Sequence, residues 1–267
     1  MTEAYSDFHS HLVPGVDDGS RTLDEALHSV DRMVGAGVSR IITTPHFRAS
    51  SMSTARYGDP LAFLDRQWCV LRDAARKAYP HLDLRLGLEV RLDVPDPDLS
   101  DPRLRLGGTP FTLVEWPMFT APPGAPEVLA RLVRDGFIPV VAHPERYYGI
   151  DGEMEVVRDW KEAGAFLQGS YGSLAGQYGR GPKARVLRLL EMGLLDYLSS
   201  DFHGRPEYTF YLKRGVSELQ RRGGGGHLDL LAKVNPARLF RGELPLPVPP
   251  LVMEEPVRHL LRSWLDD

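Results

Sequence analysis

Short apolar runs alternate with amphipathic segments along most of the chain. Seven of these runs are rich in β-branched or aliphatic residues and have the length of a single strand. They cover residues 4–8, 39–44, 82–88, 111–116, 138–143, 164–169 and 195–200. Because strands that alternate with helices form βα units, the pattern predicts an α/β fold with a parallel sheet.

The segments between these runs carry helix start and stop signals. The segment 22–37 begins with Thr22 as N-cap, has Glu25 at the capping-box position and ends at glycine. Segments 124–136 and 179–193 have proline near the start and glycine at the end, and 62–79 is a longer amphipathic stretch. All four segments are therefore predicted to be helices.

Two stretches interrupt the alternation. Residues 91–110 are rich in proline and aspartate, so we expect an irregular excursion there. Residues 245–250 predict an extended surface segment, and 255–267 predict a final helix. We find no repeat and no linker, and we expect one domain over residues 1–267 with a C-terminal extension from about residue 245.

The amino-acid composition of the chain excludes some classes of function but does not by itself identify one. A net charge of −4 and a pI near 6.1 give no basic surface for nucleic acid, so no nucleic-acid partner is expected. No segment reaches about 20 apolar residues and no signal-like core follows the start, so we expect no membrane insertion and a cytoplasmic location. The single cysteine, Cys69, has no disulfide partner in the chain and is interpreted as an ordinary helix residue.

Potential metal ligands gather where the expected strands end. Six of the seven runs end in His, Asp or Glu, and the run 164–169 ends in Gly, Ser and Tyr. In a parallel barrel all these ends lie at one rim, where such folds build their sites. The residues concerned are His9, His11, His46, Glu89, Glu115, His143, Asp201 and His203.

The spacing of these residues favours chelation. His9 and His11 stand two residues apart, so both imidazoles project to the same side of an extended strand. Asp201 and His203 repeat that spacing. The sequence therefore predicts a metal cluster with imidazole and carboxylate ligands.

Each residue on its own also has a structural interpretation. Asp17 and Asp18 fit the turn chemistry of "DDGS", and His143 could be a hydrogen-bonded core histidine. Glu89 and Glu115 end apolar strands, so buried salt bridges to arginine would be an alternative to a cation.

Taken together, the motifs resemble those of the PHP (polymerase and histidinol phosphatase) superfamily. They are "DFHSHLVPGVDDGS", "IITTPHF", "GLEV", "VEWP", "VVAHPERY" and "LSSDFH", in this order between residue 7 and about residue 206. Within the superfamily they are similar to the bacterial capsule-associated manganese-dependent protein-tyrosine phosphatases. The H-x-H start is common to all PHP proteins, whereas "PGVDDGS" and "AHPERY" point to the phosphatase branch.

The resemblance implies a distorted (β/α)7 TIM-like barrel with three divalent metal ions at one rim. Manganese is the expected metal, with iron or zinc as alternatives, since carboxylates and imidazoles suit all three. The implied ligands are His9 and His11 with Glu89 and Asp201 for one ion, Glu89 with Glu115 and His143 for the second, and Asp18, His46 and His203 for the third. Asp18 rather than Asp17 occupies the matching position.

The resemblance further implies a phosphomonoesterase that attacks with a metal-activated hydroxide. Arg146 and Arg205 match arginines that bind the substrate phosphate and take part in catalysis. The implied substrate is phosphotyrosine in a bacterial tyrosine kinase that controls capsule or exopolysaccharide synthesis. One departure is that only Gly204 separates His203 from Arg205, where the family has several residues, often beginning with Asn.

Two other functions remain open at this point. One is a small-molecule phosphatase, such as a histidinol-phosphate phosphatase, and the other is a metal-binding regulator without turnover. An open site would favour a phosphotyrosyl segment, and a closed pocket would favour a metabolite. Phe119, Tyr147, Tyr148 and Tyr171 lie near the motifs and could stack on a phenyl ring or simply pack. The sequence leaves the oligomeric state open.

Overall fold

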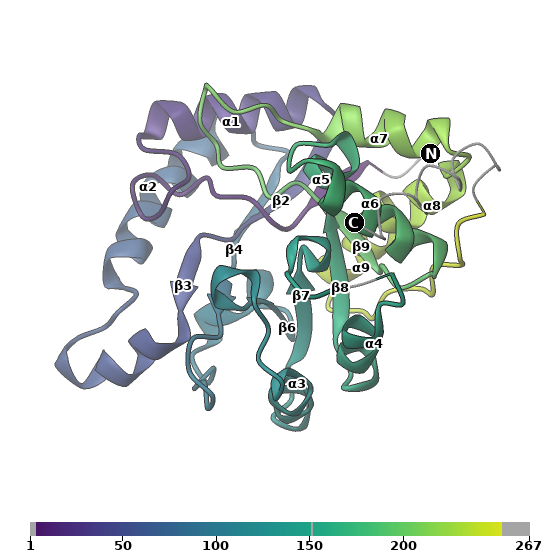
Figure 1. Cartoon of the computed structure of the whole chain (residues 1–267). Helices are drawn as coiled ribbons and strands as arrows, with labels where there is room; N and C mark the ends of the chain where they lie inside the picture. The colour runs from purple at the N-terminus through teal and green to yellow at the C-terminus, as the bar shows by residue number, and fades with distance from the viewer. Residues whose placement is uncertain (1–3, 151, 253–267) are drawn as a thin grey trace.

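The strands of the protein form a ring that is surrounded by helices (Figure 1). The structure is a computed structural model that describes residues 4–150 and 152–252. The helix expected over 255–267 lies outside the described residues. The strands are β1 Tyr5–Asp7, β2 Val38–Thr43, β3 His46–Arg48, β4 Asp83–Leu86, β5 Glu89–Arg91, β6 Phe111–Glu115, β7 Ile138–Ala142, β8 Phe166–Ser170 and β9 Tyr197–Ser199.

Helices connect most consecutive strands, as the alternating pattern predicts. They are α1 Leu23–Gly35, α2 Ala62–Ala78, α3 Ala125–Arg134, α4 Glu155–Glu162, α5 Tyr171–Ala175, α6 Arg180–Glu191, α7 Leu212–Arg221, α8 Gly225–Asp229 and α9 Asn235–Phe240. Shorter turns of helix are η1 Ala49–Tyr57, η2 Pro102–Leu104, η3 Leu106–Gly108, η4 Pro117–Phe119, η5 Pro144–Arg146 and the π-helical η6 Leu230–Val234. The Thr22 side chain caps α1 by accepting a hydrogen bond from the Glu25 N–H.

All seven expected strands occur, but two of them are interrupted. β2 ends at Thr43 and the chain continues past Pro45 into β3, while β4 ends at Leu86 and continues past Gly87 into β5. Pro45, which lies between β2 and β3 in the chain, has no N–H group to donate to a neighbouring strand, so it interrupts the ladder of hydrogen bonds there. A Cβ atom at position 87 would lie 2.8 Å from the Leu106 side chain, so the close approach of these two segments requires Gly87. Apolar periodicity alone did not indicate either break.

The breaks divide the ladders into two parallel sheets, one ordered β1-β2-β4 and the other β3-β5-β6-β7-β8-β9. Hydrogen bonds close the ring between the first and last strands: the Asp201 N–H donates to the His9 carbonyl, and the His11 N–H to that of Phe202, both at 2.8 Å. The strands thus follow one another around a distorted (β/α)7 TIM-like barrel, and the expected fold class is confirmed.

The barrel interior has its own small apolar cluster, separate from the layer between strands and helices. Phe8, Ile42, Leu113, Val140 and Tyr197 belong to this inner cluster, together with side chains from η3 and α9. The larger cluster lies between the strands and helices such as α1, α3, α4 and α6. The ring is therefore a packed core with room for polar chemistry only at its ends.

The two irregular stretches behave differently from each other. Beyond Arg91, the last residue of β5, the segment 91–110 contains only the short turns η2 and η3 and buries Leu99, Leu104 and Leu106, so its predicted irregularity is confirmed. The segment 245–250 is mostly exposed, as expected, but Val248 is buried, and just beyond it the Leu251 N–H donates to the Leu190 carbonyl of α6. The alternating prolines of this segment gave no indication in the sequence of the buried Val248 or of the Leu251 hydrogen bond.

Cys69 lies exposed on α2, as an ordinary helix residue. Among the described helices, none combines the length and the apolar character that crossing a membrane would take.

Candidate metal centre

Strand β6 shows how the barrel brings a carboxylate to the rim. Phe111 and Leu113 point into the inner cluster, and Glu115 continues the same alternating row one step farther along. On the neighbouring strands, Glu89 is in register with Leu113, and His46 is in register with Glu89. Strand pairing therefore places His46 beside Glu89 just above the apolar core, with Glu115 one step farther along the neighbouring strand β6.

The structure brings together all nine side chains that the sequence proposed as metal ligands. Donor atoms within each of four overlapping groups lie within 4.8 Å of one another. The groups are His11, Asp18, His46 and His203; His9, His11 and Asp201; His9, Glu89 and His143; and His46, Glu89 and Glu115. Segments almost 200 residues apart in the chain thus meet in one cluster.

The grouping agrees with most of the implied ligand sets. His9, His11 and Asp201 form one group, and Asp18, His46 and His203 share another. Glu115 differs, because it groups with His46 and Glu89 rather than with His143. Asp18 belongs to a group, whereas Asp17 does not.

Two of the histidines present a free nitrogen to the cluster. His9 Nδ1 lies 2.7 Å from Gln168 Oε1, and His11 Nδ1 lies 2.7 Å from Asp17 Oδ2. Both Nε2 atoms are buried and have no hydrogen-bond partner among the described residues. Such a pattern, with one ring nitrogen oriented by a polar group and the other left bare, is typical of metal-bound histidine.

The carboxylates and imidazoles shift one another's protonation strongly. Burial alone would lower the pKa of His46, but Glu89 and Glu115 raise it to about 10. Burial would raise the pKa of Glu89, yet His9 and His46 hold it well below its usual range. The carboxylates thus attract positive charge into a buried site, and divalent cations can supply that charge in place of protons. The donor set therefore fits metal ions.

Backbone strain is concentrated in the same region. His143 has φ of 34° and Asp201 has φ of 51°, both in the left-handed region that non-glycine residues seldom occupy. Each such residue costs about 1–3 kcal/mol and persists only where its surroundings enforce it. Both residues belong to the cluster, so the strain coincides with the candidate function.

The alternative of a salt bridge to arginine applies to one glutamate only. Arg91 donates to Glu115 Oε1 at 2.8 Å through Nε. Every partner that the structure gives for Glu89 is an imidazole, namely that of His9, His11, His46 or His143. Glu115 therefore has a structural partner beside the cluster, whereas Glu89 has only potential metal ligands around it.

Asp18 rather than Asp17 was expected as the ligand, and the structure places Asp17 beside the cluster in a different role. Asp17 Oδ2 accepts from the His46 N–H at 3.0 Å as well as facing His11 Nδ1. Gly19 allows this arrangement, because a Cβ there would lie 2.2 Å from the His11 carbonyl oxygen. Asp18 thus belongs to the cluster as a potential ligand, whereas Asp17 orients His11 and holds the backbone of His46. The H-x-H motif followed by adjacent aspartates was the only sequence signal for this.

We expect Asp17→Asn to weaken metal binding by about 10- to 100-fold, because His11 would lose the carboxylate that fixes its ring. A competition titration with a chelating dye measures this directly. Asp24→Asn, an exposed aspartate in the first turn of α1, is the matched control. Unchanged metal affinity in Asp17→Asn would show that Asp17 serves only the turn.

Arg146 borders the cluster in a fixed position. Its Nη1 donates to Asp201 Oδ2 at 2.7 Å. Its guanidinium lies between two aromatic rings, 4.3 Å from the Phe119 centroid and 4.2 Å from that of Tyr178. The Tyr178 hydroxyl also donates to Asp201 Oδ2, at 3.3 Å. Neither aromatic contact was expected from the sequence.

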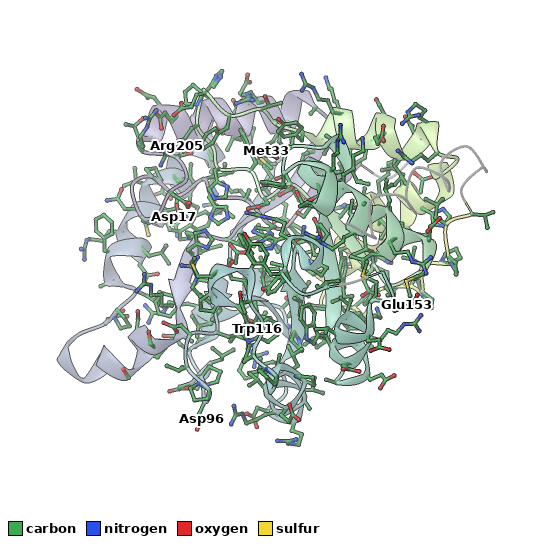
Figure 2. All side chains as sticks on the ribbon, in the orientation of Figure 1. Asp17, Met33, Asp96, Trp116, Glu153 and Arg205 are labelled. Atoms are coloured by element: carbon green, nitrogen blue, oxygen red, sulfur yellow. The ribbon has the colours of Figure 1, made fainter. Side chains whose placement is uncertain are left out.

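Arg205 is oriented differently. Its Nε donates to the Gly19 carbonyl at 2.9 Å, so it supports the loop that carries Asp17 and Asp18. Arg205 and Asp17 lie toward the same edge of the molecule (Figure 2). The short connection through Gly204 leads the arginine to this loop, and its expected contact with phosphate remains a prediction.

A depression of about 220 Å³ opens beside Arg146 and the cluster. Asp18, Asp201 and His203 line one part of it, and Tyr178 and Tyr211 line another. Two of the aromatic residues considered for stacking on a substrate, Tyr147 and Tyr171, are fully buried and cannot do so. Phe119 packs on Arg146, and Tyr148 is 75% exposed.

Comparison with known proteins agrees with this site. Residues 5–241 match the family described as capsular polysaccharide synthesis, CpsB/CapC. The tyrosine-protein phosphatase YwqE of Bacillus subtilis is 28% identical over 249 residues, covering 91% of this chain and 94% of the relative. The tyrosine-protein phosphatase CpsB of Streptococcus agalactiae is 29% identical, covering 74% of this chain and 82% of the relative.

A solved structure from work on YwqE of Bacillus subtilis and CpsB of Streptococcus pneumoniae, described as metal-dependent tyrosine phosphatases, superposes with a TM-score of 0.77. It is 28% identical, and the match covers 93% of this chain and 99% of that one. The family match over residues 5–241 includes all nine residues of the candidate metal centre. The chain therefore belongs to the CpsB/CapC family of capsular polysaccharide synthesis.

Proposed function

We propose that this protein is a metal-dependent phosphomonoesterase that hydrolyses phosphotyrosine in proteins. The observation that carries the proposal is the convergence of nine His, Asp and Glu side chains beside the guanidinium of Arg146. Such a cluster can hold cations next to a group that binds phosphate oxygens. YwqE of Bacillus subtilis and CpsB of Streptococcus agalactiae are both named tyrosine-protein phosphatases, which supports the same reaction.

The metal ions, when bound, would lower the pKa of water and offset the charge of the phosphate. We propose three divalent ions, with manganese first and iron or zinc as alternatives, held by His9, His11, Asp18, His46, Glu89, Glu115, His143, Asp201 and His203. The overlap of the groups at His11 and Glu89 supports ions that share ligands.

Arg146 would bind an equatorial phosphate oxygen through the guanidinium N–H groups that Asp201 leaves free. Stacking between Phe119 and Tyr178 holds the guanidinium plane, so little order is lost when phosphate arrives. Arg205 would assist if its side chain left the Gly19 carbonyl. The phenolate of tyrosine is a good leaving group and needs little help from an acid.

Exposure at one edge of the cluster favours a protein substrate over a small metabolite. The side chain of Asp18 is 63% exposed, and those of His46 and His203 are 24% and 21% exposed. A phosphotyrosine that projects from a chain segment can reach such an edge without being enclosed. We propose a bacterial tyrosine kinase of capsule or exopolysaccharide synthesis as the physiological substrate, met in the cytoplasm.

The proposal is tested by phosphate release from a phosphotyrosine peptide and from histidinol phosphate, each with Mn²⁺ and after exhaustive chelation. We expect hydrolysis of the peptide that depends on metal and a kcat/KM well above that for histidinol phosphate. A preference for histidinol phosphate would indicate a metabolite phosphatase. No turnover of either ester, with metal bound, would indicate a regulator, and full activity after chelation would refute metal dependence.

A further inference from the structure

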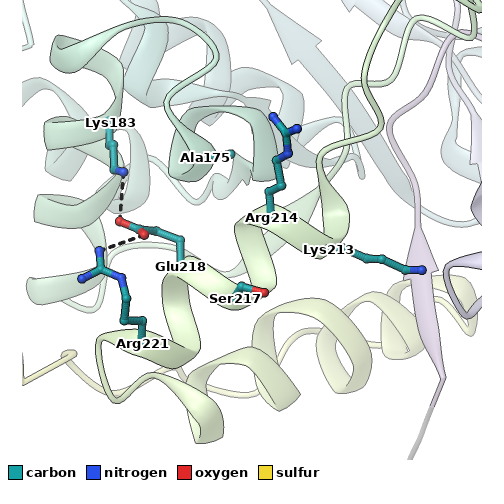
Figure 3. A pocket seen from close by; sticks show the side chains of 7 residues that line it. All are labelled: Ala175, Lys183, Lys213, Arg214, Ser217, Glu218 and Arg221. Atoms are coloured by element: carbon teal, nitrogen blue, oxygen red, sulfur yellow. Dashed lines mark hydrogen bonds and ion pairs between the residues drawn. The ribbon is translucent and has the colours of Figure 1, made fainter.

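A second depression, outside the metal centre, is lined mainly by cations. It lies between α5, α6 and α7 and has a volume of about 430 Å³. Figure 3 shows its main side chains, which are Lys183, Lys213, Arg214, Ser217, Glu218 and Arg221. Four cations thus accompany one carboxylate, in a chain whose net charge is −4. We call these six residues the basic depression.

The single carboxylate of the basic depression is already neutralised. Glu218 accepts from Lys183 at 2.9 Å, from Arg221 at 2.9 Å and from Arg222 at 2.7 Å. Burial would raise the pKa of Glu218, but these three cations lower it to about 2. Glu218 therefore holds the cations in place and leaves an excess of positive charge.

Two further cations are available to a ligand. Lys213 and Arg214 are exposed at the start of α7, and within the described part of the chain neither forms an ion pair. The guanidinium carbon of Arg214 lies 5.7 Å from the centre of the Tyr211 ring. Unpaired arginine beside a hollow favours anionic ligands, because its N–H groups match carboxylate oxygens in pairs.

The basic depression adjoins the depression beside the metal centre. Two chain segments line both depressions. Ala175 and Lys213 lie at the basic depression, and Gln177 and Tyr211, each two positions away from one of them, line the depression beside the metal centre. Residues two positions apart lie at most about 7 Å from each other. A peptide that is bound at the metal centre by one residue could therefore reach Arg214 with a residue a few positions away.

We propose that the basic depression binds Asp or Glu side chains that flank the phosphotyrosine in the substrate protein. This inference rests on the proposed function, since it extends the same site along the substrate chain. Charge complementarity identifies the ligand: the excess cations require an anionic segment, and the adjoining metal centre requires that the segment carry the phosphotyrosine. Because the cations are solvent-exposed, their contribution falls as salt screens it.

The test compares three phosphotyrosine peptides, one with alanine on both sides and two with three glutamates placed two to four residues before or after the phosphotyrosine. For the unmodified protein with Mn²⁺, we expect one Glu peptide to have about five- to tenfold higher kcat/KM than the Ala peptide at low salt. In Lys213→Glu/Arg214→Glu, this ratio should fall to about 1. The control Lys77→Glu/Arg134→Glu makes the same charge change at exposed sites on α2 and α3 and should keep the ratio.

Equal kcat/KM for all three peptides in the unmodified protein, or a ratio that survives in Lys213→Glu/Arg214→Glu, would overturn the inference. Hydrolysis of p-nitrophenyl phosphate and of histidinol phosphate distinguishes this result from failure of the proposed function, which would show as no turnover of any ester or as a preference for histidinol phosphate. In that event, fluorescence anisotropy with an unphosphorylated Glu peptide still decides: equal binding by variant and unmodified protein contradicts the basic depression. Tighter, Arg214-dependent binding of a short single-stranded RNA would also contradict it, in favour of a nucleic-acid ligand.

Discussion

Replacement of both His9 and His11 by alanine is expected to abolish hydrolysis of an aryl phosphate and to lower the bound metal. The two imidazoles contribute to three of the four ligand groups, and both bare Nε2 atoms face the carboxylates of Glu89 and Asp201. Their loss removes ligands from the centre of the cluster and leaves carboxylates that repel one another. We expect activity to fall by at least about 10³-fold, since metal ions supply both the nucleophile and charge neutralisation.

Metal analysis of the purified variant and phosphate release measure the two effects together. His28→Ala/His81→Ala is the matched control, because it removes two exposed histidines that lie outside the cluster. Its metal content and activity should equal those of the unmodified protein. If the His9/His11 variant kept its metal and its rate, the cluster would be a structural polar network.

Replacement of Arg146 by alanine is expected to lower kcat/KM for an aryl phosphate by about 10²- to 10³-fold, with metal content unchanged. The guanidinium lies beside Asp201 and between two rings, so it meets the phosphate already oriented. Arg146→Lys should recover little, since an ammonium neither stacks flat nor donates in pairs. Loss of metal in Arg146→Ala would instead assign the arginine to holding Asp201.

Variants of Tyr178, one of the two stacking rings, separate the orientation of Arg146 from its charge. Tyr178→Phe keeps the ring and should stay near the unmodified rate, whereas Tyr178→Ala should show part of the Arg146 defect, mainly in KM. Arg134→Ala, an exposed arginine of α3, is the control for loss of one positive charge. An equal loss of activity in Tyr178→Phe and Tyr178→Ala would mean that catalysis depends on the hydroxyl group bonded to Asp201 and not on the ring.

The sequence was sufficient to predict which residues would meet, because parallel strands align their ends. Eight of the nine potential ligands follow or end an apolar run, so recognising the runs placed these eight at one rim, and the resemblance to the PHP superfamily added Asp18. The breaks after β2 and β4 were missed because an apolar pattern does not show where a chain must bend. The bend after β4, for example, brings Gly87 close to Leu106, a contact between distant parts of the chain.

The contacts around the ligands could not be predicted in the same way. Gln168, Asp17 and Tyr178 reach the cluster through side-chain directions that depend on packing, and their residue types carry no distinctive spacing. Burial of Tyr147 and Tyr171 likewise depends on helices that cover them from outside the ring. Local sequence pattern therefore indicates the ligands, and tertiary packing determines what orients them.

The seam between β1 and β9 has a consequence for biosynthesis. The hydrogen bonds that join His9 and His11 to Asp201 and Phe202 link the segments that directly follow β1 and β9, the first and last strands of the described residues. Glu89 follows these two imidazoles early in the chain, whereas nearly 200 residues separate them from Asp201, their second carboxylate partner. The complete cation site can therefore form only after His203 has been synthesised.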